Sequence, residues 1–585
     1  MVVLPPNEED EVHNSNYILY WNYVGLELNR LTHSVTVGGP QNGPPISARA
    51  LGILHLAIHD AYFMIKPGTG FTTYLNAGLP AAQHADDPKA AVVGAAITVL
   101  EKLYTQPRAE VSQNATDQLS QLLKQWVDGF PGLDILAPSY RFGVSVGNAI
   151  LDSLDIKPNE PGADQGQYRP QAGKFHFRDD LTNPVKLVPI NPNQPDVKRA
   201  VHQYHAPFYG ITAKRFAVHD DHMVADPPVE DGKTSTGAEE TEFSDAFQEV
   251  IRLGGAPELF STCRQPKDTV GAYFWAYDGA NLIGTPPRFY NRILRTLAWN
   301  NRRDGPTHEN TNAEFARLFA LANVAMADAS ILCWREKYHH DFLRPISAVR
   351  EDTNQPMVDL FWRPLGAPST NTDKISFTPP FPAYPSGHAT FGAAAFQIVR
   401  LFYKSIGVTN FEADGPDDIA FDIVLDELDG VSRDLRQTYD QTQPITNQPG
   451  TVRTYVKRRF ESLWELIFEN AISRVLLGVH WRFDAFAAND VLVSSTSEPT
   501  SKTEKEPCEI RHYKKASDIK YVTSGPRTDQ SGSFPIGGVP LGLEIANDIF
   551  RNNLQPTPKE LQPSLYRSLV DLASPKTAEK HRAGL

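Results

Sequence analysis

The sequence predicts an all-α protein built from two four-helix bundles that are joined by long loops rich in Pro and Gly. Two observations lead to this fold class. Apolar residues recur at helical spacing over most of the chain, and Pro, Gly, Asn and Asp concentrate between about residues 158 and 240. A third observation, a partial repeat between the two halves, is consistent with bundles related by duplication.

Six stretches show the helical pattern. They span residues 46–66, 91–104 and 113–127 in the first half, and 311–340, 386–406 and 452–478 in the second. We therefore expect an N-terminal bundle with long loops over 1–240 and a C-terminal bundle over 241–500. Residues 501–585 are expected to form a peripheral extension, because their sequence is polar at first and later has no strong pattern.

The repeat consists of two groups of residues. Ala48-Arg49, Ala57 and Asp60-Ala61 return at one constant offset as Ala316-Arg317, Ala325 and Asp328-Ala329, and Gly94-Ala95-Ala96 returns as Gly392-Ala393-Ala394. Small residues on helices also recur by chance, so the repeat alone does not establish a duplication. The copies differ just before the second group, where Pro385-Ser386-Gly387-His388 stands in place of Asp87-Pro88-Lys89-Ala90. One functional site is then expected, in the C-terminal bundle.

Composition limits the class of protein. The 585 residues are 41% hydrophobic and 21% charged, as in a soluble globular protein. The sequence has no run of about 18 apolar residues, so we expect no membrane span. A net charge of −13 argues against nucleic acid as a partner. The N-terminus lacks the apolar segment of a secretory signal, which leaves the compartment open.

The three cysteines, Cys263, Cys333 and Cys508, are too few for a disulfide framework. We expect each to be a free thiol in or near a core. The ligand spacings typical of zinc sites and of covalently attached haem do not occur in the sequence.

Three segments of the C-terminal half carry candidate oxyanion ligands. In the first, Lys337 and Arg344 are seven residues apart, which places both on one helical face, with Pro345 ending the helix near Arg344. In the second, a proline-rich loop leads into an Ala-rich helix that starts at Ser386 and Gly387. Backbone N–H groups at a helix start lack intrahelical partners and attract anions.

Two histidines accompany these donors. His388 follows Gly387 in the first turn of its helix, and His480 follows the predicted end of the helix that carries Arg474. Asp484 can orient His480 or cap the next helix. Each segment alone has an ordinary structural role, such as a solvated helix face, a Ser N-cap or a structural His. Together they suit a tetrahedral oxyanion, with one His to bind its central atom and the other to move protons.

This combination resembles the signature shared by vanadium haloperoxidases and type 2 phosphatidic-acid-phosphatase-like acid phosphatases. The residues that carry the resemblance are Lys337, Arg344-Pro345, Pro385-Ser386-Gly387-His388, Ser473-Arg474, Gly478, His480 and Asp484. The resemblance to the fungal vanadium chloroperoxidases covers most of the chain. It includes Asn16-Tyr17 through His59-Asp60-Ala61-Tyr62, Trp275-Ala276-Tyr277-Asp278 and Phe534-Pro535-Ile536-Gly537-Gly538.

The resemblance implies one vanadate per chain, with vanadium bound by His480. The residues that it implies for the vanadate oxygens are Lys337, Arg344, Ser386, Gly387 and Arg474. His388 would be the acid–base residue that deprotonates hydrogen peroxide, and Lys337 would also polarise the bound peroxide. Asp278 would pair with Arg474.

The implied activity is oxidation of chloride, and of bromide as well, by hydrogen peroxide to hypohalous acid, which reacts with diffuse organic acceptors. Trp334 and Phe381 resemble the two aromatics near the halide site of the fungal enzymes, whereas algal bromoperoxidases usually have His in place of Phe381. The resemblance also implies a secreted monomer.

Three alternatives stay open. One is a bromide-preferring haloperoxidase. Another is an acid phosphatase in which His480 forms a phosphohistidine and His388 protonates the leaving alcohol. A non-enzymatic anion-binding or scaffold protein is less consistent with the sequence, because binding alone would not require both histidines.

Overall fold

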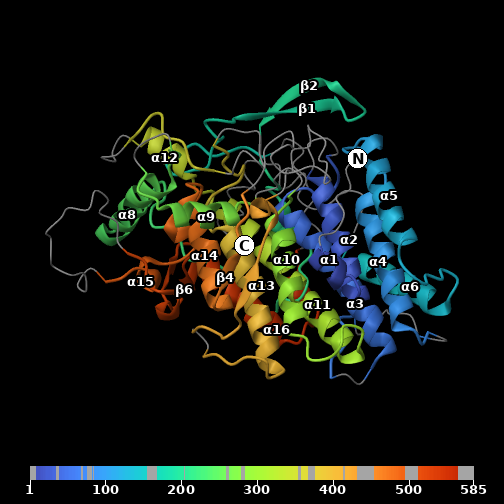
Figure 1. Cartoon of the computed structure of the whole chain (residues 1–585). Coiled ribbons are helices and arrows are strands. Elements are labelled where there is room, and N and C mark those ends of the chain that lie inside the picture. The colour runs from blue at the N-terminus through green and yellow to red at the C-terminus, as the bar shows by residue number, and fades with distance from the viewer. Residues whose placement is uncertain are drawn as a thin grey trace.

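The computed structural model describes residues 8–33, 38–67, 70–75, 82, 85–154, 168–202, 204–257, 262–277, 283–352, 358–366, 376–412, 415–430, 454–494 and 512–563. Over these residues the all-α prediction is confirmed, because helices form both bundles and the strands form three separate antiparallel pairs (Figure 1).

The elements of the first half are α1 (Glu8–His13), α2 (Tyr17–Thr32), α3 (Pro44–Ile65), α4 (Pro88–Leu100), the π-helix η1 (Glu101–Thr105), α5 (Gln113–Asp128), α6 (Pro138–Ser153), β1 (Val185–Asn191), β2 (Gln194–His202), α7 (Tyr209–Thr212), α8 (Gly237–Gly254) and α9 (Pro266–Phe274). Those of the second half are α10 (Pro286–Asn300), α11 (Glu309–His340), α12 (Pro345–Glu351), α13 (Gly387–Ser405), β3 (Phe421–Ile423), β4 (Arg458–Phe460), α14 (Leu463–Leu476), α15 (Ala488–Val491), β5 (Ser524–Arg527), β6 (Gln530–Pro535) and α16 (Gly538–Arg551). Short 3-10 turns span Asp426–Leu428, Arg482–Asp484, Ala516–Asp518 and Lys559–Leu561.

Two sequence predictions of local structure need correction. The helix predicted over 452–478 begins only at Leu463, because Ser462 caps it by accepting a hydrogen bond from Glu465 N at 3.1 Å. The stretch predicted as long loops contains the antiparallel hairpin of β1 and β2, which projects from the helices in Figure 1.

Helix α11 lies at the centre of the molecule and packs against α3 of the first bundle and α13 of the second. It is long and apolar enough to cross a membrane, but its most apolar window is entirely buried inside the protein. The length and apolar composition of α11 therefore reflect its position in the hydrophobic core. Its C-terminal end lies at the candidate site.

The repeat has structural counterparts on α3 and α11. The carboxylate of Asp60 accepts hydrogen bonds from the backbone N–H groups of Tyr74 and Leu75, at 2.7 and 2.9 Å. Asp328, the matching residue of α11, accepts three such bonds from residues 216–218, at 2.7–3.0 Å. Both carboxylates thus accept backbone N–H bonds from a loop, but the loop follows Asp60 in the sequence and precedes Asp328.

The predicted peripheral extension is partly wrong. Within it, α16 packs against α13, where Gly538 and Gly542 allow close approach of the two helices. A Cβ on Gly538 would lie 2.5 Å from the carbonyl oxygen of Ser386, and one on Gly542 would overlap that of Thr390. Residues 538–551 thus belong to the C-terminal core, whereas 564–585 lie outside the described residues.

The cysteines also differ from expectation. Cys333 is free and buried, as predicted. Cys263 is disulfide-bonded, and its partner lies outside the described residues, as does Cys508. The low number of cysteines did not reveal this bond, because pairing depends on spatial proximity rather than on count.

Candidate functional site

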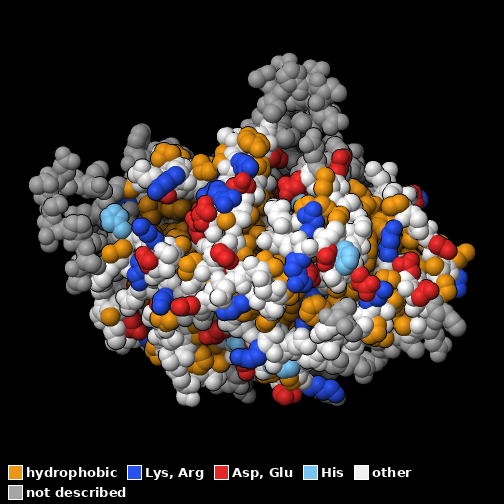
Figure 2. Space-filling model, turned by 60° about the horizontal axis from the view of Figure 1, so that its bottom comes forward, with side chains coloured by type: hydrophobic (Ala, Val, Ile, Leu, Met, Phe, Trp, Pro, Cys, Tyr) orange, Lys and Arg blue, Asp and Glu red, His pale blue; other side chains and the backbone are white. Residues whose placement is uncertain are grey.

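The three predicted segments meet at the end of α11, the start of α13 and the turn after α14. Lys337, Arg344 and Arg474 are all buried there, each at most 2% exposed. Together with His388, all three cations act electrostatically on His480, so the five residues occupy one site. On the face of the molecule shown in Figure 2, acidic and basic side chains are interspersed, which contrasts with this buried concentration of cations.

The prediction that Lys337 and Arg344 lie on one helical face is wrong, because helix α11 ends before Arg344. Asp341 has a left-handed backbone conformation (φ 51°) that terminates α11, and Arg344 is the N-cap of α12, which starts at Pro345. The Arg344 side chain nevertheless reaches the site. Its Nε donates to Phe381 O and its Nη1 to Val479 O, both at 2.8 Å.

Lys337 is held by the proline-rich loop that precedes α13. Its Nζ donates to the carbonyl oxygens of Pro382 and Ala383, each at 2.9 Å, and of Pro385 at 2.5 Å. Burial lowers the pKa of Lys337 to about 7, because the charged ammonium loses its hydration. An anion beside Nζ would restore the charged form.

The start of α13 is a serine N-cap that lies beside the cations. Ser386 is the N-cap, with its Oγ accepting from Ala389 N at 3.4 Å and its backbone N–H donating to Asp484 O at 2.7 Å. Gly387 lies against Trp334, and a Cβ at this position would be 3.3 Å from Trp334 Cζ3. The glycine therefore allows the aromatic ring and the helix start to come together.

His388 is buried in the first turn of α13. Its carbonyl oxygen accepts hydrogen bonds from Asn470 Nδ2 at 2.8 Å and from Tyr290 Oη at 3.2 Å. These contacts from α14 and α10 fix the backbone from which the imidazole extends. Sequence reasoning did not identify Asn470 or Tyr290, because neither has a local motif.

His480 is oriented on both ring nitrogens. Nδ1 pairs with Asp484 Oδ2 at 2.7 Å, and Nε2 accepts from Arg344 Nη1 at 2.9 Å. A guanidinium only donates hydrogen bonds, so the proton of a neutral imidazole is on Nδ1 and the lone pair is on Nε2. Burial, and then the positive charge of Arg344, hold the pKa of His480 well below its usual range.

Asp484 performs both roles considered from the sequence. The Oδ2 that pairs with His480 also accepts from Trp481 N at 3.0 Å, which shapes the turn after α14. Burial raises the pKa of Asp484 to about 7. The turn itself depends on Gly478, which has φ +73° and lies against the carbonyl oxygen of Gly254. This donor set, with a neutral Nε2 among buried cations, can hold an oxyanion and bind its central atom.

Comparisons with known proteins identify the family of the chain. A family model described as the N-terminal domain of vanadium chloroperoxidase matches residues 4–215, and one described as the second helical-bundle domain matches 317–492. Vanadium chloroperoxidase from Curvularia inaequalis is 51% identical over 583 residues, covering 96% of this chain and 94% of that protein. The chain belongs to the vanadium chloroperoxidase family.

Solved structures with the same architecture include more distant haloperoxidases. A bacterial vanadium-dependent iodoperoxidase has a TM-score of 0.51 at 17% identity, covering 95% of this chain and 99% of its own. An apo-type bacterial vanadium-dependent chloroperoxidase has a TM-score of 0.52 at 14% identity, covering 89% and 97%. At these identities the likeness shows the fold alone.

The two aromatics expected from the vanadium chloroperoxidase resemblance lie together at the site. The ring centroids of Trp334 and Phe381 are 4.8 Å apart with an interplanar angle of 49°. Lys337 Nζ is 5.7 Å from the Trp334 ring and 5.2 Å from the Phe381 ring, and Arg344 Cζ is 4.9 Å from Phe381. The buried rings of Trp334 and Phe381, here called the aromatic wall, thus adjoin the cations. Asp278, the expected partner of Arg474, lies outside the described residues.

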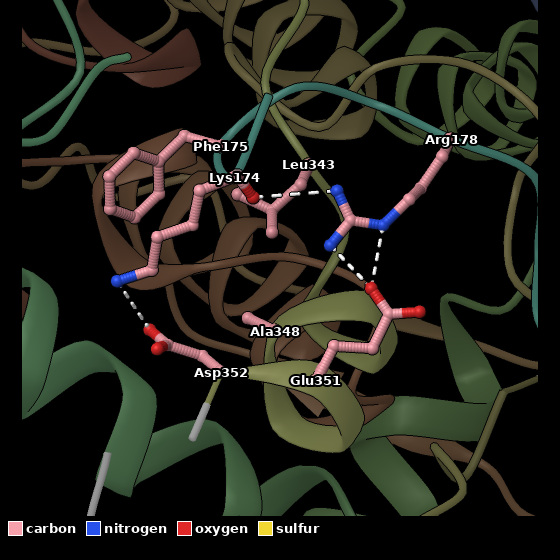
Figure 3. A pocket seen from close by; sticks show the side chains of 7 residues that line it. All are labelled: Lys174, Phe175, Arg178, Leu343, Ala348, Glu351 and Asp352. Atoms are coloured by element: carbon pink, nitrogen blue, oxygen red, sulfur yellow. Dashed lines mark hydrogen bonds and ion pairs between the residues drawn. The ribbon is translucent and has the colours of Figure 1, made fainter. Parts of the chain in front are cut away.

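A cavity of about 190 Å³ is separate from this site (Figure 3). Its lining residues are Lys174, Phe175, Arg178, Leu343, Ala348, Glu351 and Asp352. The charged residues pair with each other, Lys174 with Asp352 at 3.1 Å and Arg178 with Glu351 at 2.5 Å. The residues predicted for the vanadium chloroperoxidase site do not line it, so we assign the cavity no part in the chemistry.

Proposed function

We propose that this chain is a vanadate-dependent chloroperoxidase, which oxidises chloride, and bromide as well, with hydrogen peroxide to hypohalous acid. The observation that carries the proposal is the burial of Lys337, Arg344 and Arg474 around the unprotonated Nε2 of His480. The 51% identity to the Curvularia inaequalis enzyme supports the same activity.

The residues fit one vanadate per chain. Burying three cations costs solvation free energy, and a tetrahedral anion with several oxygens offsets that cost. Lys337, Arg344, Ser386, Gly387 and Arg474 would hold its oxygens, and neutral His480 would bind vanadium through Nε2. When bound, vanadate supplies a Lewis acid that makes peroxide electrophilic without a change of metal oxidation state.

The protein side chains supply charge, orientation and proton transfer. Lys337, fixed by three carbonyls, polarises the peroxide, and Arg474, with Asp278 as its proposed partner, balances negative charge. His388 accepts a proton from incoming hydrogen peroxide at a ring nitrogen and returns it to the leaving oxygen. Trp334 and Phe381 exclude water next to the halide.

The reaction balances as one hydrogen peroxide, one halide ion and one proton giving hypohalous acid and water. The O–O bond of peroxide breaks and an oxygen–halogen bond forms. An electron pair moves from the halide to peroxide, and the departing oxygen leaves as water. Hypohalous acid then diffuses to organic acceptors.

The test is halogenation of a dye by hydrogen peroxide with chloride or bromide, using metal-stripped protein with and without orthovanadate. We expect activity only with orthovanadate, and inhibition by excess phosphate, which competes for the same donors. Tight vanadate binding without halogenation, together with hydrolysis of a phosphate ester, would instead establish the acid phosphatase alternative.

Two variants assign the histidines. His480→Ala should abolish both vanadate binding and activity, because the metal ligand is lost. His388→Ala should retain vanadate but oxidise chloride at a strongly reduced rate, since only proton transfer is lost. Unchanged chlorination by the second variant would remove His388 from the mechanism.

The location and assembly of the chain are also proposed. The family resemblance supports a secreted monomer. Sedimentation of the purified protein tests the monomer, and its presence in the culture medium of the source organism tests secretion.

A further inference from the structure

The aromatic wall of the site has a neighbour from the N-terminal half of the chain. His205 follows β2, and its half-buried ring lies 6.3 Å from Trp334 at 86° and 6.1 Å from Phe381 at 51°, centroid to centroid. We infer that His205 is a specificity-determining residue, whose ring completes the halide pocket and favours chloride over bromide. This inference rests on the proposed function.

The backbone of His205 is bonded to both sides of the wall. Its N–H donates to Pro380 O at 2.9 Å, next to Phe381. Its carbonyl oxygen accepts from Trp334 Nε1 at 3.2 Å and from Tyr338 Oη at 2.8 Å, both on α11. The position of His205 is therefore set by the same two segments that carry the halide-site aromatics.

The ring is supported from behind by the start of α3. A Cβ on Gly43 would overlap both Cε1 and Nε2 of His205, so the imidazole rests directly on the glycine backbone. Gly43 has φ +86°, and its N–H donates to His33 Nε2 at 2.9 Å. The N-terminal bundle thus prevents the ring from moving away from the wall on this side.

A closed wall matters more for chloride than for bromide. Chloride is smaller and more strongly hydrated than bromide, so it loses more hydration free energy on entering the pocket. A stronger electrostatic attraction from Lys337 and Arg344 must offset that loss. This attraction is strong only where the local dielectric constant is low, and water that enters the pocket would raise the dielectric constant. Loss of the His205 ring should therefore weaken chloride binding more than bromide binding.

His205→Ala isolates the ring, because the backbone bonds to Pro380, Trp334 and Tyr338 remain available. His205→Phe restores a flat ring in the same place. His202→Ala is the matched control, since His202 is in the same segment but its side chain is 62% exposed and pairs with Asp179. The steady-state KM and kcat for chloride and bromide would be measured on vanadate-loaded protein.

We expect His205→Ala to raise KM for chloride about tenfold and for bromide less than about threefold, with kcat at saturating halide nearly unchanged. His205→Phe should restore most of the chloride preference, and His202→Ala should behave as the wild type. An unchanged ratio of chloride to bromide kcat/KM in His205→Ala would overturn the inference.

Two further measurements distinguish a role in the halide pocket from a structural role and from failure of the proposed function. Vanadate affinity, measured by calorimetry on metal-stripped protein, should be unchanged in His205→Ala; a parallel loss would show a merely structural role and overturn the inference. A wild type that oxidises neither halide would refute the proposed function. Broadening of the halide NMR signal by wild type and His205→Ala would then still test the pocket, with equal broadening overturning the inference.

Discussion

Nη1 of Arg344 donates a hydrogen bond to Nε2 of His480 at 2.9 Å. Since Asp484 Oδ2 accepts a hydrogen bond from Nδ1–H at 2.7 Å, the two partners together select one tautomer of the imidazole. The nitrogen proposed to bind vanadium is therefore unprotonated and directed toward the cations.

Asp484→Asn should weaken vanadate binding by about 10–100-fold, the usual loss when the partner of a metal-binding histidine is changed. The neutral amide accepts the hydrogen bond from Nδ1–H less strongly than the carboxylate does, so it orients the imidazole and favours this tautomer less. Calorimetric titration of metal-stripped protein with orthovanadate measures the effect. Asp490→Asn is the control, because Asp490 is also buried but binds Thr523 instead. Equal affinity of Asp484→Asn and wild type would contradict the proposed role.

Gly387→Ala should lower vanadate affinity by about tenfold or more, with little change in thermal stability. The added Cβ would lie 3.3 Å from Trp334 Cζ3 and 3.7 Å from Lys337 Cε, so the wall or the anion must shift. Gly237→Ala is a matched control, since Gly237 also follows a helix N-cap but has open space around its Cβ position. Full vanadate affinity in Gly387→Ala would rule out anion binding at the start of α13.

The pKa of Lys337 predicts a pH-dependent stability of the metal-stripped protein. Burial lowers this pKa from 10.5 to about 7, so between these values the unfolded chain binds more protons than the folded one. The Lys337 contribution to stability is therefore smallest below pH 7 and rises with pH, by at most about 1.4 kcal/mol per unit. Urea unfolding of wild type and Lys337→Met across pH 6–9 would show this as a changing difference. A constant difference would mean that Lys337 keeps its ordinary pKa.

The two equivalent carboxylates of the bundles should differ in their effect on stability. Asp328→Asn should cost more than Asp60→Asn, because Asp328 accepts three backbone N–H bonds and Asp60 accepts two. Each loss should be about 1–3 kcal/mol in the free energy of unfolding, measured with urea. Asp196→Asn, on exposed strand β2, is the control. Destabilisation no greater than that of the control would refute the anchoring role.

Periodicity predicted the helices that surround the site, and residue chemistry predicted its donors. Periodicity could not predict the path between Lys337 and Arg344, because that path depends on the left-handed backbone conformation of Asp341 and on the new helix that starts at Pro345. The choice of Asp484 as the partner of His480 also required coordinates. Contacts between residues far apart in the sequence leave no local sequence pattern. Examples are the hydrogen bond from Asn470 to the carbonyl oxygen of His388 and the packing of α16 against α13. The pairing of Asp278 with Arg474 stays a prediction.

The packing of the His205 ring on the Gly43 backbone has a consequence for how the halide preference of such enzymes can change. The residues proposed to hold vanadate all belong to the C-terminal half of the chain. The proposed halide pocket also includes the ring of His205, which rests on Gly43, and both residues belong to the N-terminal half. Substitutions in the first half could therefore retune which ion is oxidised and leave the grip on the cofactor intact. Directed evolution for a new halide preference would accordingly begin around residues 43 and 205.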